Sequence, residues 1–127
     1  MAVYTTIDDP SAYFQTTLYT GNGSTNAITN SGNSDLQPDW VWIKKRSATE
    51  NHALYDSVRG TTKTLYSNLT EAEYTESTSL TAFGSDGFTL GADGIVNANT
   101  GTYVSWNWKE SATAGFDIVS YTGNSSV

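Results

Sequence analysis

The sequence predicts an all-β protein, an antiparallel β-sandwich of jelly-roll type with at most one short helical turn. Thr, Ser, Asn and Gly supply 56 of the 127 residues, and charged residues make up only 15%. This composition is rich in strand and turn formers and poor in helix formers. Short apolar stretches also alternate with Gly- and Asn-rich turns every eight to twelve residues, a spacing typical of sandwiches and barrels.

Two strands that carry tryptophan are central to this prediction. Pro38–Arg46 and Thr102–Lys109 each contain a Trp-x-Trp element followed by a cation, and together they hold all four tryptophans. Because side chains alternate between the faces of a strand, the two indoles of each strand share one face. We expect these strands to form opposite walls of the core, with the tryptophans packed between them.

The remaining elements follow in chain order. Apolar runs bounded by turn residues predict strands over residues 12–19, 27–29, 52–58, 61–66, 80–83, 88–90 and 116–121. The spacing of residues 52–58 predicts a hairpin with the first tryptophan strand. The only helical turn is expected over residues 68–74, where Asn68 or Thr70 would cap a first turn that contains acids.

An internal repeat divides the chain. Phe14–Ser24 and Phe116–Ser126 share Phe, Tyr, Thr, Gly, Asn and Ser at an offset of 102 residues. We therefore expect a docking arm over residues 1–11, one sandwich unit over 12–109, and a linker with the first strand of a second repeat over 110–127. The alternative is that the last strand closes the same sandwich and resembles the first because the two occupy equivalent positions.

Charge and composition exclude several classes of function. The net charge of −7 and the pI near 4.3 argue against a nucleic-acid partner, and the five cations between residues 44 and 63 are explained by a solvated strand end. Cysteine is absent, which excludes disulfides and thiolate metal sites. No apolar run has the length of a membrane span or a signal peptide, so we expect synthesis in the cytoplasm and no membrane insertion.

The sequence lacks a recognisable catalytic arrangement. His52 is the only histidine, and it would lie on the opposite strand face from Ser57, so the two could not act as base and nucleophile. No strand carries the spaced carboxylates of a sandwich-type glycoside hydrolase. We therefore expect no enzyme activity and no cofactor. Asp86 and Asp93, each followed by Gly, are weak calcium-ligand candidates, since Asp-Gly is also the commonest tight-turn dipeptide.

Aromatic side chains offer a binding function instead. Tyrosines that stack on sugar rings, beside amides that donate and accept hydrogen bonds, would recognise a glycan. The candidates are Tyr13, Tyr55, Tyr66, Tyr74 and Tyr103, with Asn97 and Asn99 in the loop before the second tryptophan strand. At any single position, a half-buried tyrosine with a solvated hydroxyl is the simpler interpretation.

Several motifs, taken as a set, resemble one family. They are Ile7–Gln15, the two Tyr-Thr-Gly-Asn turns, Leu36–Lys44, Tyr55–Gly60, Ser85–Gly91 and Tyr103–Lys109. Together they resemble the tandem-repeat virion proteins of marine bacteriophages, which are similar to concanavalin-A-like lectin or SPRY-type sandwiches. The resemblance covers nearly the whole chain. It implies a virion protein of a tail fibre or tail-associated appendage, and it carries no catalytic residues across.

The expected function is therefore a non-enzymatic structural subunit of a bacteriophage virion. Such a subunit would form a homo-oligomer and contact other virion proteins. The alternative is a lectin-like module that recognises a glycan on the host surface during attachment.

Overall fold

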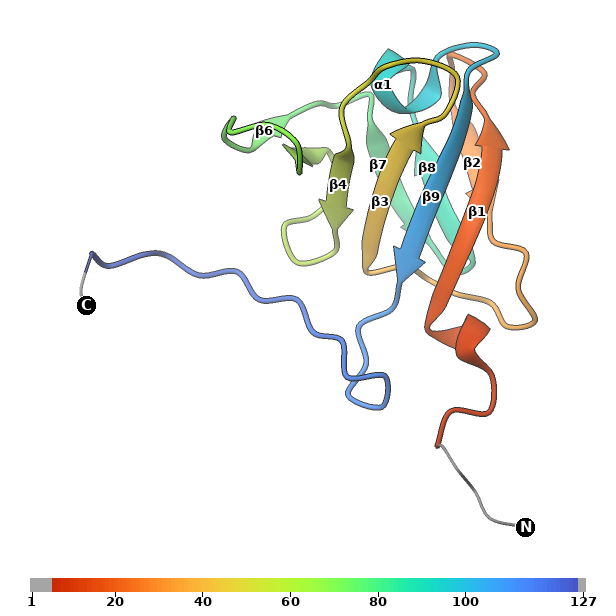
Figure 1. Ribbon diagram of the computed structural model, residues 1–127, viewed down its shortest axis with the longest axis vertical. Helices are drawn as coiled ribbons and strands as arrows, with labels where there is room; N and C mark the ends of the chain where they lie inside the picture. The colour runs from red at the N-terminus through yellow and green to blue at the C-terminus, as the bar shows by residue number, and fades with distance from the viewer. Residues whose placement is uncertain (1–5, 126–127) are drawn as a thin grey trace.

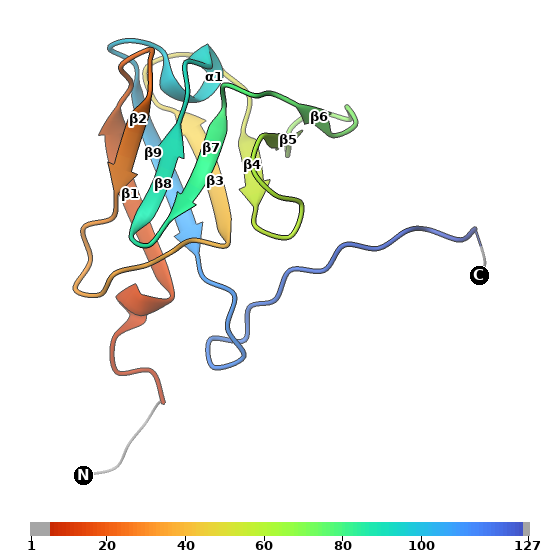
Figure 2. The same cartoon turned by 180° about the vertical axis from the view of Figure 1, so that it is seen from behind.

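The computed structural model describes residues 6–125, which form a sandwich of two antiparallel sheets (Figure 1, Figure 2). The six-stranded sheet has the order β1-β9-β3-β4-β5-β6, and the three-stranded sheet has the order β2-β8-β7. The all-β sandwich predicted from the sequence is confirmed. The elements are η1 (Pro10–Ala12), β1 (Phe14–Thr20), β2 (Asn26–Thr29), β3 (Trp40–Lys45), β4 (Ala53–Asp56), β5 (Lys63–Tyr66), β6 (Tyr74–Thr75), β7 (Leu80–Gly84), β8 (Gly87–Leu90), α1 (Gly94–Asn97) and β9 (Thr102–Trp108).

Hairpins join most neighbouring strands. β3 and β4 form the predicted hairpin, in which Trp40 lies opposite Asp56. β7 and β8 meet in a tight turn that ends at Gly87, where φ is +119° and an added Cβ would overlap the carbonyl oxygen of Ile28. Only glycine fits such a position. β9, the last strand in chain order, lies between β1 and β3 and joins β1 to the rest of the larger sheet.

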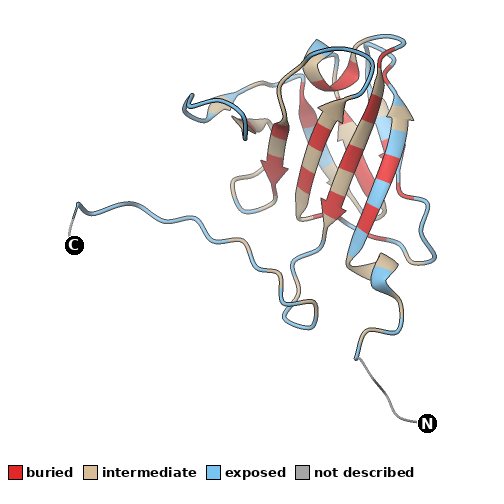
Figure 3. Cartoon of the chain, viewed as in Figure 1, coloured by how far each residue is buried: buried red, intermediate tan, exposed pale blue. Residues whose placement is uncertain are grey.

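The hydrophobic core lies between the two sheets. Alternate residues of β3 and β4 point inward, and Figure 3 shows the resulting alternation of buried and partly buried residues along the strands. Each large side chain buried in this way contributes about 1.5–3 kcal/mol. The buried apolar residues of the cluster are Ile28, Val41, Ile43, Ala53, Tyr55, Leu80, Phe88, Leu90, Val96 and Tyr103.

The interior beneath β1 and β9 is polar. The Nδ2 of Asn107 donates to the carbonyl oxygen of Gln15 and to Oδ1 of Asn30, both at 3.2 Å. Thr17 donates its hydroxyl to the same Oδ1 of Asn30 at 2.8 Å. Buried polar groups require such partners. Hydrogen bonds, rather than apolar packing, therefore fix this half of the interior.

The prediction that the tryptophan strands form opposite walls is wrong. β3 and β9 are neighbours in one sheet, with Trp40 opposite Trp108 and Trp42 opposite Trp106. The inward residues of β9 are instead Tyr103, Ser105 and Asn107, all fully buried. The two Trp-x-Trp elements therefore form a single cluster on the face that points away from the core.

The helical turn also lies elsewhere than predicted. Residues 68–74 do not form a helix, because the Asn68 side chain bonds the backbone N–H of His52 at 2.9 Å and Tyr74 pairs with β5. The helical turns within residues 6–125 are η1 and α1. Asp93 caps α1 by accepting a hydrogen bond from the N–H of Ile95 at 3.0 Å.

The segments outside the sandwich are short and polar. The predicted docking arm falls partly outside the described residues; its last part is tied to its own chain by Asp9, which caps η1 and accepts a hydrogen bond from Ser34 at 2.7 Å. At the other end, Ser111 pairs with Phe116 around a turn. Residues 116–121 do not form the predicted strand, since no described strand lies beside them.

Candidate functional site

The face of the six-stranded sheet that points away from the core is apolar. Phe14 and Leu18 on this face are 40% and 62% exposed, and its other apolar residues are partly buried. A contiguous apolar patch of this kind marks an interaction site. We define the outer face by nine side chains on five strands: Phe14, Leu18, Trp40, Trp42, Leu54, Leu65, Val104, Trp106 and Trp108.

The strand register arranges these side chains in rows. Directly opposed residues of antiparallel strands point to the same face, so each row runs across the sheet. The rows are Phe14, Trp108 and Trp40; then Trp106, Trp42, Leu54 and Leu65; then Leu18 and Val104. The patch is therefore continuous from the edge strand β1 to β5.

The rings of the outer face pack edge to face. The Trp42 and Trp106 ring centroids are 5.6 Å apart at an interplanar angle of 62°, and those of Trp40 and Trp108 are 6.2 Å apart at 61°. Phe14 extends the cluster to β1, with its ring 4.8 Å from that of Trp108. Such pairs contribute about 0.5–1.5 kcal/mol each beyond their burial. The tilts also mean that the paired indoles do not form a flat platform.

The indole N–H groups have different environments. Trp42 Nε1 donates to Nδ1 of His52 at 3.1 Å, which fixes both rings at the end of β4. Trp40 Nε1 is buried and has no acceptor among the residues described. A buried donor without an acceptor is costly. Trp40 is therefore the indole with most to gain from an added polar partner.

Phe116 covers one end of the outer face. Its ring lies 5.8 Å from that of Trp40 and stacks at 22° on that of Trp108, 6.2 Å away. Trp42 completes a wholly apolar pocket of about 170 Å³ with these three rings. The C-terminal segment thus occupies part of the apolar surface and leaves the rows nearer the other end of the sheet open.

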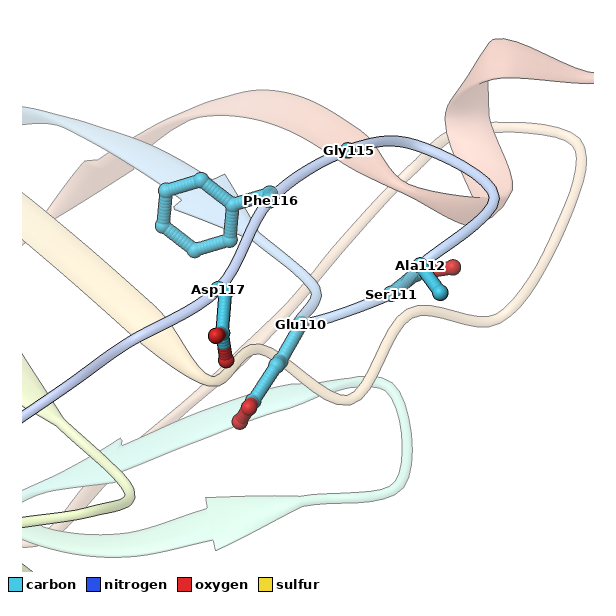
Figure 4. A pocket seen from close by; sticks show the side chains of 6 residues that line it. All are labelled: Glu110, Ser111, Ala112, Gly115, Phe116 and Asp117. Carbon is cyan, nitrogen blue, oxygen red and sulfur yellow. The ribbon is translucent and has the colours of Figure 1, made fainter.

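A pair of carboxyl groups lies at the base of the Phe116 turn. Glu110 and Asp117 flank the bridge between Ser111 and Phe116, and Figure 4 shows their side chains projecting toward the same side of an open hollow of about 560 Å³. A hydrogen bond with Asp117 raises the pKa of Glu110. A proton on Glu110 is therefore favoured by the nearby carboxyl group when the turn is formed.

An ion pair between Arg59 and Asp56 lines one wall of a groove beside the outer face. Arg59 binds Asp56 at 2.5 Å and Glu73 at 3.0 Å, and it also donates to the carbonyl oxygen of Leu54 at 3.3 Å. Residues 117–121 form the opposite wall of this groove, which has a volume of about 390 Å³. Because the guanidinium is already engaged with β4 and the β6 region, its evident role is to hold the edge of the sheet together.

Three of the seven proposed glycan contacts are buried, which contradicts their assignment to the surface. Tyr55, Tyr103 and Asn97 each have 0% exposure. Tyr103 accepts a hydrogen bond from the N–H of Ala98 at 2.8 Å and donates to the carbonyl of Gly94 at 3.1 Å. Burial raises the pKa of Tyr55 and of Tyr103. These residues shape the core and the loop around α1.

The other four candidates are scattered over the surface. The hydroxyls of Tyr66 and Tyr74 bond each other between β5 and β6, and desolvation is the main cause that raises the pKa of Tyr66. Tyr13 is partly buried beside η1, and Asn99 is exposed in the loop after α1. The structure does not bring these side chains together into one site.

The two aspartates considered for calcium lie at opposite ends of β8. Asp86 sits in the turn before the strand and accepts a hydrogen bond from the N–H of Leu36 at 3.1 Å, whereas Asp93 caps α1 beyond its other end. Burial raises the pKa of Asp93. The two loops therefore do not converge, and within residues 6–125 no group of three or more His, Asp or Glu side chains is placed to hold a metal.

His52 and Ser57 have separate partners at the two ends of β4. His52 accepts from Trp42, and Ser57 donates its hydroxyl to Oδ1 of Asp39 at 2.9 Å. Asp39 also accepts from the N–H of Glu110 at 2.8 Å, which fixes the start of the C-terminal segment. These hydrogen bonds connect loops.

The outer face was missed because its tryptophans were placed in the core. The alternation of Ser105 and Asn107 with Trp106 and Trp108 in β9 could not have revealed it. A strand with apolar residues on one face and small polar residues on the other normally turns the apolar face inward. Here the buried hydrogen bonds of Asn107 reverse that arrangement.

One family model matches most of the chain. It is described as a domain of unknown function (DUF7483) and matches residues 9–127. No curated protein and no solved structure matches the chain. Within residues 6–125, no helix has the length and apolar character needed to cross a membrane.

Proposed function

The chain belongs to the DUF7483 family of domains of unknown function, and we propose that it is a non-enzymatic structural subunit of a bacteriophage virion. Its place would be a tail fibre or tail-associated appendage, which it enters after synthesis in the host cytoplasm. The outer face joins it to a second copy of the same chain, and further virion proteins bind the assembled oligomer.

The apolar outer face is the observation that carries this proposal. It combines four indoles, a phenylalanine ring and four aliphatic side chains on one continuous sheet surface. Aromatic residues are enriched, and charged residues depleted, at the centre of protein interfaces. Along this surface β1 carries no charged side chain. A second identical surface offers a partner of the same largely apolar composition, with Lys44 at the row of Leu18 and Val104.

Association in solution tests this proposal. Leu18 is 62% exposed on the outer face, so Leu18→Lys places a charge in the interface with little cost to the fold. Leu69→Lys, at a residue that is 40% exposed in the loop before β6, is the matched control. Sedimentation velocity over a range of concentrations should show equal association for the parent chain and for Leu69→Lys, and weaker association for Leu18→Lys. Equal association of both variants would contradict the proposal.

Carbohydrate recognition is the second candidate, favoured by the partly exposed indoles of Trp42 and Trp106. A single indole face can stack on a sugar ring, and the neighbouring Lys44 ammonium carries donors for sugar hydroxyls. A glycan array separates the two functions. Specific binding that Trp42→Ala abolishes would support a lectin-like module that contacts the host surface, and the absence of any signal would support the structural subunit.

A further inference from the structure

The C-terminal segment repeats the N-terminal one in sequence and in one local hydrogen bond. Asp9 accepts a hydrogen bond from the N–H of Ser11 at 2.9 Å, and a turn then leads to Phe14. Ser111 stands 102 residues later and accepts from the N–H of Thr113 at 3.2 Å before a turn that leads to Phe116. A side-chain hydrogen bond to the N–H two residues on thus precedes both Phe14 and Phe116.

The matched residues are those that β1 uses to bind the sandwich. Tyr19 stacks on Tyr103 at a centroid distance of 5.1 Å and donates its hydroxyl to the carbonyl of Val96 at 2.8 Å. Gly21 packs so closely that an added Cβ would overlap the carbonyl oxygen of Ala98. A tyrosine and a glycine two residues apart are therefore the sequence requirement of the β1 position.

The C-terminal segment meets this requirement with Tyr121 and Gly123 but does not occupy such a position. Tyr121 is 89% exposed and Val119 is 73% exposed. Beyond the bridge of Phe116 to Ser111, the described part of this segment pairs with no strand. An extended run of aromatic and β-branched residues, with Asp117 as its single charged side chain, is suited to pair with the edge of another sheet.

We infer that residues 116–124 are a β1-type strand that pairs with β9 of a second copy of this chain, in place of the β1 of that copy. The repeat offset fixes the register. Ser120 then lies opposite Val104, as Leu18 does in the present sheet, and Thr122 lies opposite Thr102, as Thr20 does. Phe116 takes the place of Phe14 on the partner's Trp108.

The exchange reproduces the ring contacts of Phe14 and Tyr19, and it replaces the hydrogen-bonded Gln15 and Thr17 by Asp117 and Val119. Replacing one strand by another of the same type is a low-cost route to association, because the acceptor sheet stays complete. Tyr121 and Val119 move from solvent to the inward positions of Tyr19 and Thr17. Since each copy donates its own C-terminal strand to the next, the contact is head to tail and extends into a fibre.

Cysteine cross-linking tests the register directly, because the chain contains no cysteine of its own. The double variant Ser120→Cys with Val104→Cys should give disulfide-linked dimers and longer ladders on a non-reducing gel. The matched control pairs Ser120→Cys with Thr81→Cys, an exposed residue of β7 in the other sheet. A yield no higher than that of the control, or a disulfide within one chain, would overturn the inference.

A second pair guards against a folding defect at Val104. Thr122→Cys with Thr102→Cys reports the same register at two residues nearer the strand end. Both pairs are also measured with Leu18→Lys present, which places a charge on the outer face wherever β1 stays paired with β9. Since Leu18 belongs to the strand that is displaced, the cross-links should persist in that background. This inference therefore stands or falls independently of the interface proposed above.

Discussion

Asn97 provides the sharpest test of the corrected site, since the sequence placed it among glycan contacts and the structure buries it completely. Its Oδ1 accepts from the N–H of Asn22 and from Nδ2 of Asn26, both at 3.0 Å. Its Nδ2, which carries two hydrogens, lies near three acceptors. These are Oδ1 of Asn22 at 3.2 Å, the carbonyl oxygen of Ser24 at 2.6 Å and that of Gly91 at 2.7 Å. One side chain of α1 thus binds the loop between β1 and β2, the start of β2 and the segment after β8.

Asn97→Ala removes all of these hydrogen bonds. At a net 0.5–1.5 kcal/mol for each bond, and with several partners able to reach water after truncation, we expect a loss of about 3 kcal/mol in the free energy of unfolding. Urea denaturation followed by tryptophan fluorescence measures it. Asn99→Ala, two residues away and exposed, should change stability by less than about 0.5 kcal/mol. A loss below about 1 kcal/mol for Asn97→Ala would refute the assignment of Asn97 as a loop anchor.

Two further predictions concern backbone space and protonation. Gly21→Ala should cost at least about 1–3 kcal/mol, because its Cβ overlaps the carbonyl of Ala98, whereas Gly94→Ala has open space and should be nearly neutral; thermal unfolding compares them. The docked turn of Phe116 raises the pKa of Glu110, so this turn binds protons more tightly than the free segment and should dock better as the pH falls. Docking of Phe116 on the indoles is followed by tryptophan quenching at different pH values. Glu110→Gln should remove the pH dependence of this quenching. The same pH profile in the parent chain and in Glu110→Gln would argue against the carboxyl pair.

The strands could be predicted because their signals are local. The turn before Phe88 predicts the start of β8, and the alternation of side chains predicts β3 and β9. All three predictions lie within a few residues of the observed bounds. The direction of the tryptophans could not be predicted in this way. Val41 and Ile43 alternate with Trp40 and Trp42, so both faces of β3 are apolar. Tertiary hydrogen bonds beneath β9 decide which face turns inward.

The misplaced helical turn has a comparable cause. Asn68 and the acids after it are good N-terminal helix signals, but the Asn68 amide is used between loops, by His52 and Asn51. Asp93-Gly94 is equally good as a tight turn or as a helix start. Its capping of α1 depends on the docking of Val96 in the core, which no local pattern specifies.

The proposed interface can be measured through the tryptophans themselves, because all four of the chain lie on the outer face. Acrylamide quenching and the emission maximum should be recorded as the protein concentration rises. Burial of the outer face in the oligomer predicts a blue shift and reduced quenching with concentration, and neither change in Leu18→Lys. Association that leaves the tryptophan emission and quenching unchanged would contradict the assignment of this face as the interface.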